Sequence, residues 1–378
     1  MIGRSTKIVL HIITGLGDGG AEAVLYSLIS KDKTHRHTVI SLSGDGKYGP
    51  LLRGVGADVI TLGMSPAWSL LAKFARLVKL IRAIQPSVVQ TWLYHADLVG
   101  GLAARLAGQR AIYWGLHNST IDQGSTKLST RIIVRLNAIL SRIVPRAIVS
   151  CSEKGAEVHV VLGYAADKMN VINNGYDLSK FRPKAAEGLG VRDEFSVPSG
   201  APLFGCVARD DPYKDHQNLL KAFAFLTRLL PEARLILVGN GMTAANPRIS
   251  HLITVNGLAE HVLLAGRRDD VPKIMNALDA LVLSSSAEAF PNVLSEAMAC
   301  GTPCASTDVG DSAIIVGPTG EICPPCDCEA LARAMYETYR RSREEPDLSH
   351  RCRKRIMDKF SIEKMVGQYA NVWRGELD

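Results

Sequence analysis

Two glutamates, Glu288 and Glu296, flank the start of an expected helix in the C-terminal half of the chain. A strand is expected over residues 280–283, and the helix over residues 292–300, where a glycine and a proline follow it. The first amides of a helix lack intrahelical partners and carry the positive end of its dipole. Such a start can hold a phosphate, while flanking carboxylates accept hydrogen bonds from sugar hydroxyls. An ordinary surface helix with two solvated glutamates is the alternative.

Two cations, Arg209 and Lys214, follow another expected strand, over residues 203–208. They lie at the carboxyl end of that strand, which is where doubly wound folds bind their ligands. The planar guanidinium of Arg209 can bind two phosphate oxygens, and Lys214 adds a point charge. Ion pairs with the neighbouring acids are the alternative, namely with Asp210, Asp211 and Asp215.

Two further strand ends of this half carry suitable groups. Gly239 and Gly241 follow a strand expected over residues 235–238, and Arg267 and Arg268 follow one over residues 261–265. Four consecutive strand ends therefore carry residues of the kind that bind phosphates or sugars. This pattern predicts a site for a nucleoside diphosphate with room for a sugar.

A glycine loop follows the first strand of the chain and suggests a competing function. Gly15-x-Gly17-x-x-Gly20 matches the dinucleotide fingerprint, between a strand expected over residues 7–14 and a helix over residues 21–30. Enzymes with this fingerprint place an acid on the ribose at the end of the second strand. Asp45 lies near that point, although in a loop, so an NAD-dependent oxidoreductase is an alternative function.

Short strands alternate with helices through both halves, which predicts parallel sheets covered by helices on both faces. The expected fold is α/β, with two Rossmann-like doubly wound domains facing across a cleft. Two domains also suit a chain of 378 residues, which exceeds the usual size of a single core. Residues 168–200 are interpreted as the linker. The expected domains are residues 1–183 and 184–357, with a C-terminal helix over residues 358–378 that packs back on the first domain.

Composition narrows the class of protein. The chain is 47% hydrophobic and 21% charged, as is ordinary for a soluble globular protein. No apolar run approaches the ~20 residues that span a bilayer, and no signal peptide is evident, so a cytoplasmic protein is expected. The eight cysteines are scattered, as is typical of reduced thiols.

The formal net charge is +7, and the basic excess lies in the N-terminal half. Two stretches there, residues 70–82 and 127–146, interleave Lys and Arg with apolar residues at helical spacing. Basic amphipathic helices of this kind often lie on anionic membrane surfaces, although ordinary surface helices are the alternative. A peripheral position on the inner face of the cytoplasmic membrane is therefore a hypothesis. Nucleic acid is not an expected partner, because Phe74 is the single aromatic residue in the two stretches and no recognition motif is present.

Taken together, the motifs resemble those of the retaining glycosyltransferases of family 4 (glycosyl transferases group 1), which have the GT-B fold. The resemblance covers nearly the whole chain and is strongest over residues 203–325. It rests on Arg209 with Lys214, Gly239-x-Gly241, the Glu288-x7-Glu296 pair, residues 174–181, 296–303 and 307–310, and, in the first domain, Gly19, Gly20 and His117.

The resemblance implies a role for each matching residue. Arg209 and Lys214 would neutralise the donor diphosphate, and Glu288 would lie near the donor sugar. Glu296 would accept the ribose hydroxyls, and His117 would lie near the transferred sugar. The segment at Arg267 and Arg268 would border the base, and Gly19 and Gly20 would approach the diphosphate. The donor would also meet the loop of Gly239 and Gly241 and the backbone amides of Phe290, Asn292, Val293 and Leu294. The chain departs from the family at Ala289 and Asp215, where glycine is common.

The implied reaction moves a sugar from a nucleoside diphosphate sugar, with a UDP-sugar expected, to a glycan or lipid-linked acceptor of cell-surface polysaccharide synthesis. The anomeric configuration would be retained, through front-face attack assisted by the leaving phosphate. No metal and no other cofactor is expected. A sugar-nucleotide epimerase of related fold and a non-catalytic scaffold are further alternatives beside the oxidoreductase.

Overall fold

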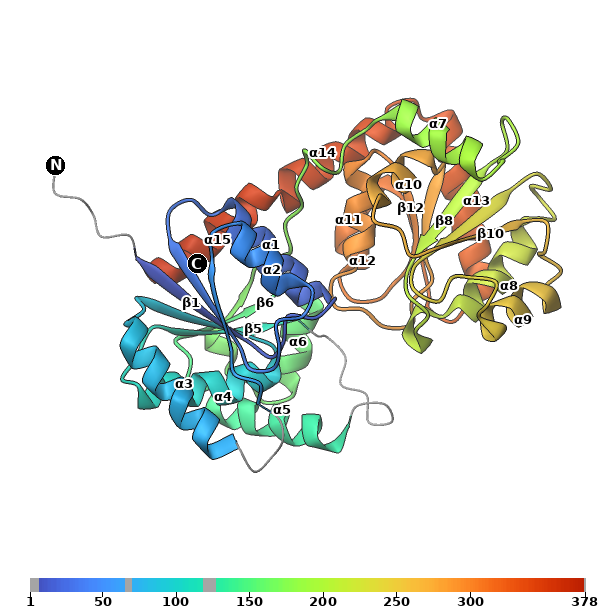
Figure 1. Ribbon diagram of the computed structural model, residues 1–378. Helices are drawn as coiled ribbons and strands as arrows, with labels where there is room; N and C mark the ends of the chain where they lie inside the picture. Colours follow the sequence, from blue (N-terminus) through green and yellow to red (C-terminus); the bar gives the residue numbers. More distant parts are fainter. Residues whose placement is uncertain (1–6, 65–69, 118–126, 377–378) are drawn as a thin grey trace, which may run out of the picture. The chain divides into compact units, whose positions relative to one another are not determined.

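The computed structural model describes residues 7–64, 70–117 and 127–376. The chain forms two compact units (Figure 1). The first unit comprises residues 1–175 together with the C-terminal stretch 362–378, and the second unit comprises Tyr176–Ser361.

The first unit is built on a seven-stranded parallel sheet with the strand order β3-β2-β1-β4-β5-β6-β7. Its strands are largely buried and mostly apolar, as expected of strands covered on both faces. The order reverses between β1 and β4, which pair through Val9 and Val88. The strands are β1 (Ile8–Ile13), β2 (Arg36–Ser41), β3 (Asp58–Thr61), β4 (Val88–Trp92), β5 (Ile112–Leu116), β6 (Ala147–Ser150) and β7 (Met169–Val171).

Helices cover both faces of this sheet. One core contains side chains of α1 (Gly20–Lys31), α2 (Tyr48–Gly54) and the C-terminal α15 (Ile362–Arg374). The core on the opposite face contains side chains of α3 (Leu70–Ile84), α4 (Tyr94–Leu106) and α5 (Leu128–Leu140). The two layers are visible above and below the sheet in Figure 1. A further helix, α6 (Glu153–Val161), lies between β6 and β7 in the chain.

The second unit has a six-stranded parallel sheet with the order β10-β9-β8-β11-β12-β13. Its strand order reverses between β8 and β11, so the loops after these two strands flank the topological switch point. The strands are β8 (Leu203–Val207), β9 (Arg234–Val238), β10 (Val262–Gly266), β11 (Ala280–Leu283), β12 (Cys304–Thr307) and β13 (Glu321–Cys323).

The helices of the second unit also form two groups. One core unites α8 (His216–Leu226), α9 (Pro247–Val255) and α13 (Cys328–Glu344). In the other group, α7 (Ala185–Glu194) packs against α10 (Val271–Ala277), and α11 (Asn292–Ala299) packs against α14 (Leu348–Phe360). A short helix, α12 (Ser312–Val316), contacts α11. Two parallel-sheet Rossmann-like domains were predicted, and this prediction is confirmed.

The predicted linker over residues 168–200 is wrong, because these residues contain β7 and α7. The strand β7 has only three residues and pairs with β6 at the sheet edge, and α7 buries only Gly188 and Val191. Neither element therefore has a clear hydrophobic periodicity in the sequence. The units change at residues 175–176, earlier than expected, and the Tyr176 amide already donates to the Phe360 carbonyl of α14 at 2.9 Å. The chain rejoins the first unit at Ile362.

All eight cysteines are free thiols. Among the described residues, we find no helix with the length and hydrophobicity needed to cross a bilayer.

Candidate functional site

The loops after β8 and β11 are joined by hydrogen bonds. The two strands are direct neighbours, with Ala280 opposite Phe204. The Ser284 hydroxyl donates to the Lys214 carbonyl at 2.7 Å, and the Ser286 amide donates to the Tyr213 carbonyl at 2.8 Å. These bonds hold the turn that carries Lys214 against the loop that carries Glu288.

Lys214 and Glu288 form an ion pair at this junction. Their side chains are 23% and 15% exposed, so the pair is largely withdrawn from solvent. The hydroxyl of Ser285 also donates to Oε1 of Glu288, at 2.8 Å. The structure thus brings together two residues predicted from separate motifs, and a phosphate that binds Lys214 would compete with the Glu288 carboxylate.

The turn after Lys214 explains one departure from the family pattern. Asp215 has φ 46° and ψ 54°, the left-handed region that favours glycine. Aspartate tolerates this region better than most residues. Its carboxylate also accepts a hydrogen bond from the Asn218 amide at 3.1 Å and so caps α8. Ala289 does not have a positive φ, so this position does not require glycine.

Arg209 lies on the surface of the same loop, with a side chain that is 64% exposed. Its guanidinium donates to Oδ2 of Asp211 from Nη2 at 2.7 Å and from Nε at 3.1 Å. The ion-pair alternative therefore holds for Arg209, with Asp211 as the partner. The Asp211 side chain is only 18% exposed, and its Oδ1 also accepts a hydrogen bond from the Tyr213 amide at 3.0 Å. Because the guanidinium faces solvent, Arg209 can turn to a phosphate while Asp211 keeps this bond.

The glycines after β9 allow its loop to approach the loop after β8. Gly239 has φ +147°, and a Cβ there would lie 2.1 Å from the Ala208 carbonyl oxygen. Gly241 has φ +86°, and its Cβ would lie 2.7 Å from Cβ of Asp210. The Asp210 amide donates to the Asn240 carbonyl at 2.8 Å. Both glycines are thus needed for the fold of the site, whatever they contact in a ligand.

The start of α11 is held from three sides. The Phe290 ring is buried and packs edge-on against Phe360, with centroids 5.6 Å apart. The Tyr176 hydroxyl donates to Oδ1 of Asn292 at 2.6 Å, and the Asp311 amide donates to the Ala289 carbonyl at 3.1 Å. Among the amides predicted to face a ligand are those of Val293, in the first turn of α11, and Leu294. The amide of Leu294 has a partner within the chain, since it donates to the Pro291 carbonyl at 3.1 Å.

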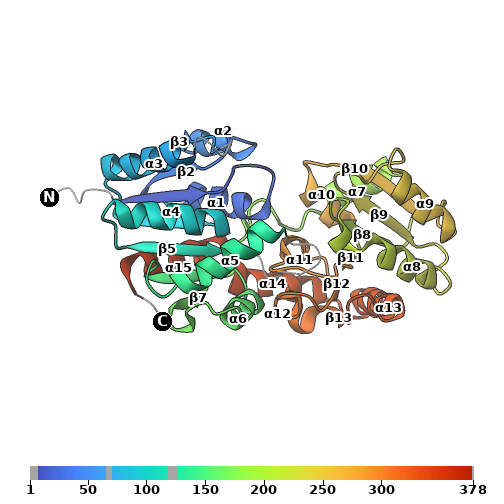
Figure 2. The same ribbon diagram turned by 90° about the horizontal axis from the view of Figure 1, so that it is seen from below.

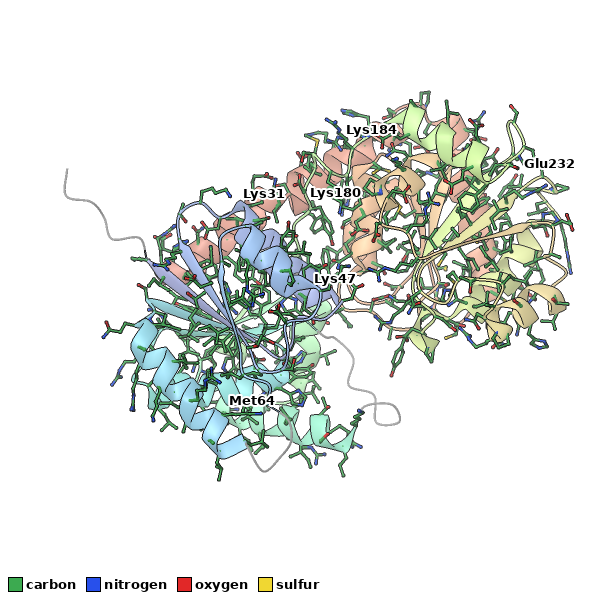
Figure 3. All side chains as sticks on the ribbon, in the orientation of Figure 1. Lys31, Lys47, Met64, Lys180, Lys184 and Glu232 are labelled. Carbon is green, nitrogen blue, oxygen red and sulfur yellow. The ribbon has the colours of Figure 1, made fainter. Side chains whose placement is uncertain are left out.

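Glu296 lies in α11 with its side chain half-buried. Burial raises the pKa of its carboxyl group to about 7, and the positive charge of Lys180, a residue labelled in Figure 3, opposes this rise. No hydrogen bond to this carboxyl group is found from any other described residue. A carboxyl group in this state can exchange protonation states near neutral pH and accept hydrogen bonds from hydroxyl groups.

The two arginines after β10 differ in their surroundings. Arg268 forms ion pairs with Glu194 of α7 and with Asp270, and its guanidinium lies 5.8 Å from the Phe195 ring centroid. Its side chain is only 20% exposed, so it joins the β10 loop to α7. Arg267 is more exposed, and its Nη2 lies 3.9 Å from Oδ1 of Asp269.

In the first unit, Gly19 and Gly20 form the start of α1 after the β1 loop, with Gly19 as its N-cap. A Cβ on Gly19 would lie 2.4 Å from Oε2 of Glu22, so the side chain of Glu22 occupies the space beside it. Asp45, the acid of the dinucleotide alternative, forms two hydrogen bonds with Arg53 at 2.7 and 2.8 Å. That pairing engages both of its carboxylate oxygens.

His117 follows β5 and stacks on the indole of Trp92, with centroids 5.0 Å apart and ring planes 17° apart. Burial lowers the pKa of His117 to about 4, so its imidazole is neutral at pH 7. Its Nε2 has no hydrogen-bond partner among the described residues. The indole Nε1 of Trp92 donates to Nδ1 of His11 at 3.2 Å, and Tyr369 of α15 stacks on the indole at 5.8 Å.

Sequence reasoning missed Trp92 and Ser285. Ser285 is the middle residue of the serine run at residues 284–286, whose composition is typical of a turn and indicates no binding role. Trp92 ends a buried strand and has no motif around it, so its contact with His117 depends on the adjacent pairing of β4 and β5.

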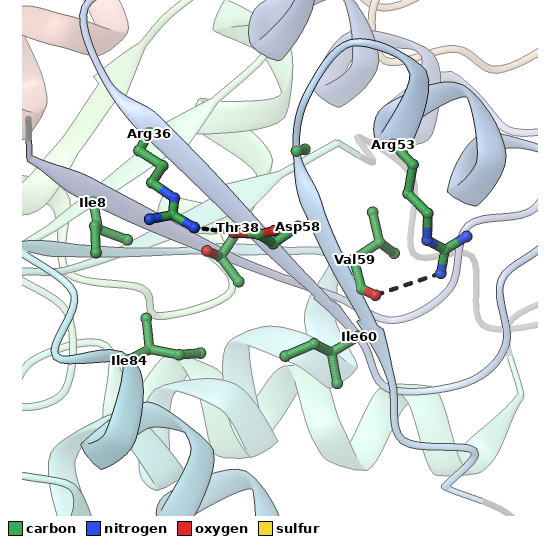
Figure 4. Close-up of a pocket in the computed structure, with 9 residues that line it drawn as sticks. Ile8, Arg36, Thr38, Arg53, Asp58, Val59, Ile60 and Ile84 are labelled. Atoms are coloured by element: carbon green, nitrogen blue, oxygen red, sulfur yellow. Dashed lines mark hydrogen bonds and ion pairs between the residues drawn. The ribbon is translucent and has the colours of Figure 1, made fainter.

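A cavity of about 610 Å³ lies elsewhere, by the amino ends of β1, β2 and β3 (Figure 4). Arg36 donates to Asp58 there at 2.9 Å, and Arg53 donates to the Val59 carbonyl at 3.4 Å. Ligands of doubly wound sheets bind at the carboxyl ends of the strands, so we do not assign the site to this cavity. Within the ranges that the structure describes, no cluster of three or more His, Cys, Asp or Glu could hold a metal ion.

Two family models match the chain, one in each half. Residues 18–180 match the family described as Glycosyltransferase Family 4, and residues 201–341 match the family described as Glycosyl transferases group 1.

Two bacterial relatives align with most of the chain. It is 24% identical over 302 residues to the UDP-Gal:alpha-D-GlcNAc-diphosphoundecaprenol alpha-1,3-galactosyltransferase of Escherichia coli, an alignment that covers 79% of this chain and 77% of the relative. It is 26% identical over 323 residues to the N,N'-diacetylbacillosaminyl-diphospho-undecaprenol alpha-1,3-N-acetylgalactosaminyltransferase of Campylobacter jejuni. That alignment covers 82% of this chain and 79% of the relative.

Solved structures share the fold. The Anabaena protein HepE in complex with UDP superposes with a TM-score of 0.84 at 22% identity, covering 98% of this chain and all of that one. A sucrose-phosphate synthase from Thermosynechococcus elongatus superposes with a TM-score of 0.78 at 21% identity, covering 98% of this chain and 99% of the other.

Proposed function

Because this chain belongs to the family-4 glycosyltransferases (glycosyl transferases group 1), we propose that it moves a sugar from a UDP-sugar to a lipid-linked acceptor in cell-surface polysaccharide synthesis. The ion pair of Lys214 with Glu288 at the switch point of the second sheet is the observation that carries this proposal. Two relatives named above transfer sugars to diphosphoundecaprenol-linked acceptors. The oxidoreductase and epimerase alternatives are not favoured, since both relatives are glycosyltransferases.

In this proposal the second unit binds the donor and the first unit binds the acceptor. Departure of the diphosphate leaves positive charge on the sugar, so the main electrostatic task of the protein is to stabilise the leaving group. Lys214 would transfer its contact from Glu288 to the diphosphate, and Arg209 would leave Asp211 for the same ligand. Glu288, released from Lys214, would then accept hydrogen bonds from the sugar. The start of α11 would add its dipole.

Glu296 would bind the ribose hydroxyls, since its half-buried carboxyl group accepts no hydrogen bond from the described residues. Arg267, exposed after β10, would border the base. Arg268 would act through the placement of this loop, because Glu194 and Asp270 already bind it. His117 would contact the transferred sugar as a neutral imidazole.

We propose further that the reaction retains the anomeric configuration and needs no metal ion. Two side-chain cations and a helix start supply the positive charge that a metal ion supplies in other transferases. Retention would follow from attack on the face that the diphosphate leaves, with the leaving phosphate as the base. The protein would act at the inner face of the membrane that holds its acceptor.

Sugar transfer from a panel of nucleoside diphosphate sugars to an undecaprenyl-diphosphate-linked sugar tests the proposal. We expect turnover with a UDP-sugar, undiminished by EDTA, and NMR of the product should show the donor's anomeric configuration. Arg209→Ala and Lys214→Ala should each lose turnover, whereas the control Lys221→Ala, at an exposed position of α8, should not. Full turnover of the Lys214→Ala enzyme would refute the assignment.

A further inference from the structure

Helix α5, labelled in Figure 2, carries a row of large apolar side chains that are exposed to solvent. Their spacing of three and four residues places them on one face of the helix and of the turn that follows it. They are between 43% and 69% exposed. A single exposed leucine is ordinary, but a contiguous apolar row marks a contact surface. The row, which we call the α5 stripe, consists of Leu128, Ile132, Leu136, Ile139 and Ile143.

The opposite face of α5 already attaches the helix to the first unit. Val134 and Ala138 lie in the hydrophobic core that α5 shares with α4. Nδ2 of the buried Asn137 donates to the Tyr94 carbonyl at 2.9 Å. The stripe is therefore not part of the core, and its side chains can be changed without removing a contact that folding needs.

Positive charge borders the stripe. Arg131, Arg135 and Arg142 fall along one edge of it at the 3.6-residue period of a helix. α5 contains no aspartate or glutamate, and no ion pair joins these arginines to an acid among the described residues. An apolar face beside a row of arginines matches the boundary between the acyl chains and the phosphates of a bilayer.

We propose that the α5 stripe inserts into the surface of an anionic lipid bilayer, with the arginines on the lipid phosphates. A second copy of the chain is a poorer occupant, because a two-fold contact between α5 helices would bring two arginine rows together. The surface is separate from the donor site of the second unit, and binding to it requires no sugar transfer.

The other basic helix, α3, lacks such a stripe. Its Leu77 and Ile81 are buried, and Phe74 and Val78 pack against the same core as α5. Two of its cations are used within the unit, where Lys73 donates to the Gly63 carbonyl and Arg82 donates to the Leu106 carbonyl. Of the two helices predicted to be membrane-active, α5 is thus the one that we assign to the bilayer.

Sedimentation with vesicles of three parts phosphatidylcholine and one part phosphatidylglycerol tests this surface. The wild-type protein should pellet with these vesicles, and more weakly at high salt. The variant Ile132→Ser/Ile139→Ser/Ile143→Ser should partition at least about tenfold less, because each change removes apolar groups that the bilayer would bury. The control variant Leu189→Ser/Leu229→Ser/Val255→Ser changes side chains of the second unit that are 60–64% exposed, and it should bind like the wild type.

Three results would overturn the proposal. The first is undiminished binding of the stripe variant, and the second is equal binding of the wild type to vesicles of phosphatidylcholine alone. The third is a dimer in analytical ultracentrifugation that the stripe variant abolishes, which would make a second copy the occupant. Transfer to a water-soluble acceptor should be unchanged in the stripe variant. Absence of transfer in the wild type, with vesicle binding intact, would count against the proposed function and not against this surface.

Discussion

Replacing Lys214 by methionine should separate two contributions of the Lys214–Glu288 pair, one to stability and one to sugar transfer. The substitution keeps a long side chain but removes the ammonium group. Two side-chain partners of Glu288 are described above, Lys214 and Ser285. Of these, the Ser285 hydroxyl, at 2.8 Å, remains in this variant. This carboxylate, which is 15% exposed, would thus lose its ion pair with Lys214.

The size of the stability effect follows from the exposure of the pair. Removing one partner of a fully buried pair costs about 3–5 kcal/mol, whereas exposed pairs contribute about 0–1 kcal/mol. With side chains 23% and 15% exposed, Lys214 and Glu288 lie between these limits. We expect the free energy of unfolding to fall by about 1–3 kcal/mol, which lowers the melting temperature by about 2–12 °C for a unit of this size.

The double variant Lys214→Met/Glu288→Gln distinguishes the two contributions. Glutamine is neutral and can still accept the Ser285 hydrogen bond, so the double variant should regain most of the lost stability in urea unfolding. Its turnover should remain about 10²–10³-fold below that of the wild type, because no cation remains at position 214 to stabilise the leaving group. Lys221→Met, at an exposed position of the same unit, is the matched control. The reasoning fails if the single variant is as stable as the wild type, or if the double variant regains turnover.

Three further predictions concern single residues. Asp215→Gly should change the free energy of unfolding by no more than about 1 kcal/mol, because glycine suits φ 46° but loses the cap of α8, whereas Asp215→Val should cost more, about 2 kcal/mol; equal stability of the two in urea would contradict this. The His117 imidazole should titrate near pH 4 in NMR spectra, and in a folded Trp92→Leu variant its pKa should rise towards the ordinary value, whereas an unmoved titration would show that Trp92 does not keep water from it. Burial raises the pKa of Glu296 to about 7. Between about pH 4.5 and pH 7 the folded state therefore keeps this proton, whereas the unfolded state has lost it. The free energy of unfolding should therefore fall from about pH 4.5 to about pH 7, and Glu296→Gln should reduce this fall; an identical pH profile of the variant would refute the shift.

The sequence predicted the two sheets because parallel strands that are covered on both faces consist of short apolar runs, and these runs alternate with helical segments. It also predicted which loops carry Arg209, Lys214 and Glu288, since the end of each strand could be located. The partners could not be predicted in the same way. The contact of Lys214 with Glu288 depends on β8 and β11 being neighbours, and strand order is not visible in the spacing of residues. Arg268 forms an ion pair with Glu194 of α7, and this helix was not predicted because residues 168–200 were interpreted as a linker.

The pairing of the predicted phosphate-binding cations with acids has a consequence for donor binding. Arg209 and Lys214 each form an ion pair, so a diphosphate gains their charge only where it displaces the acid. The cost of displacement follows exposure, because water replaces the lost contact at the surface but not in the interior. Arg209, 64% exposed, is the easiest to recruit, and Lys214 requires that Glu288 find new donors at the same time. Sugar hydroxyls are such donors. A nucleoside diphosphate without its sugar should therefore bind less tightly than the intact donor, since only the donor satisfies both members of the pair.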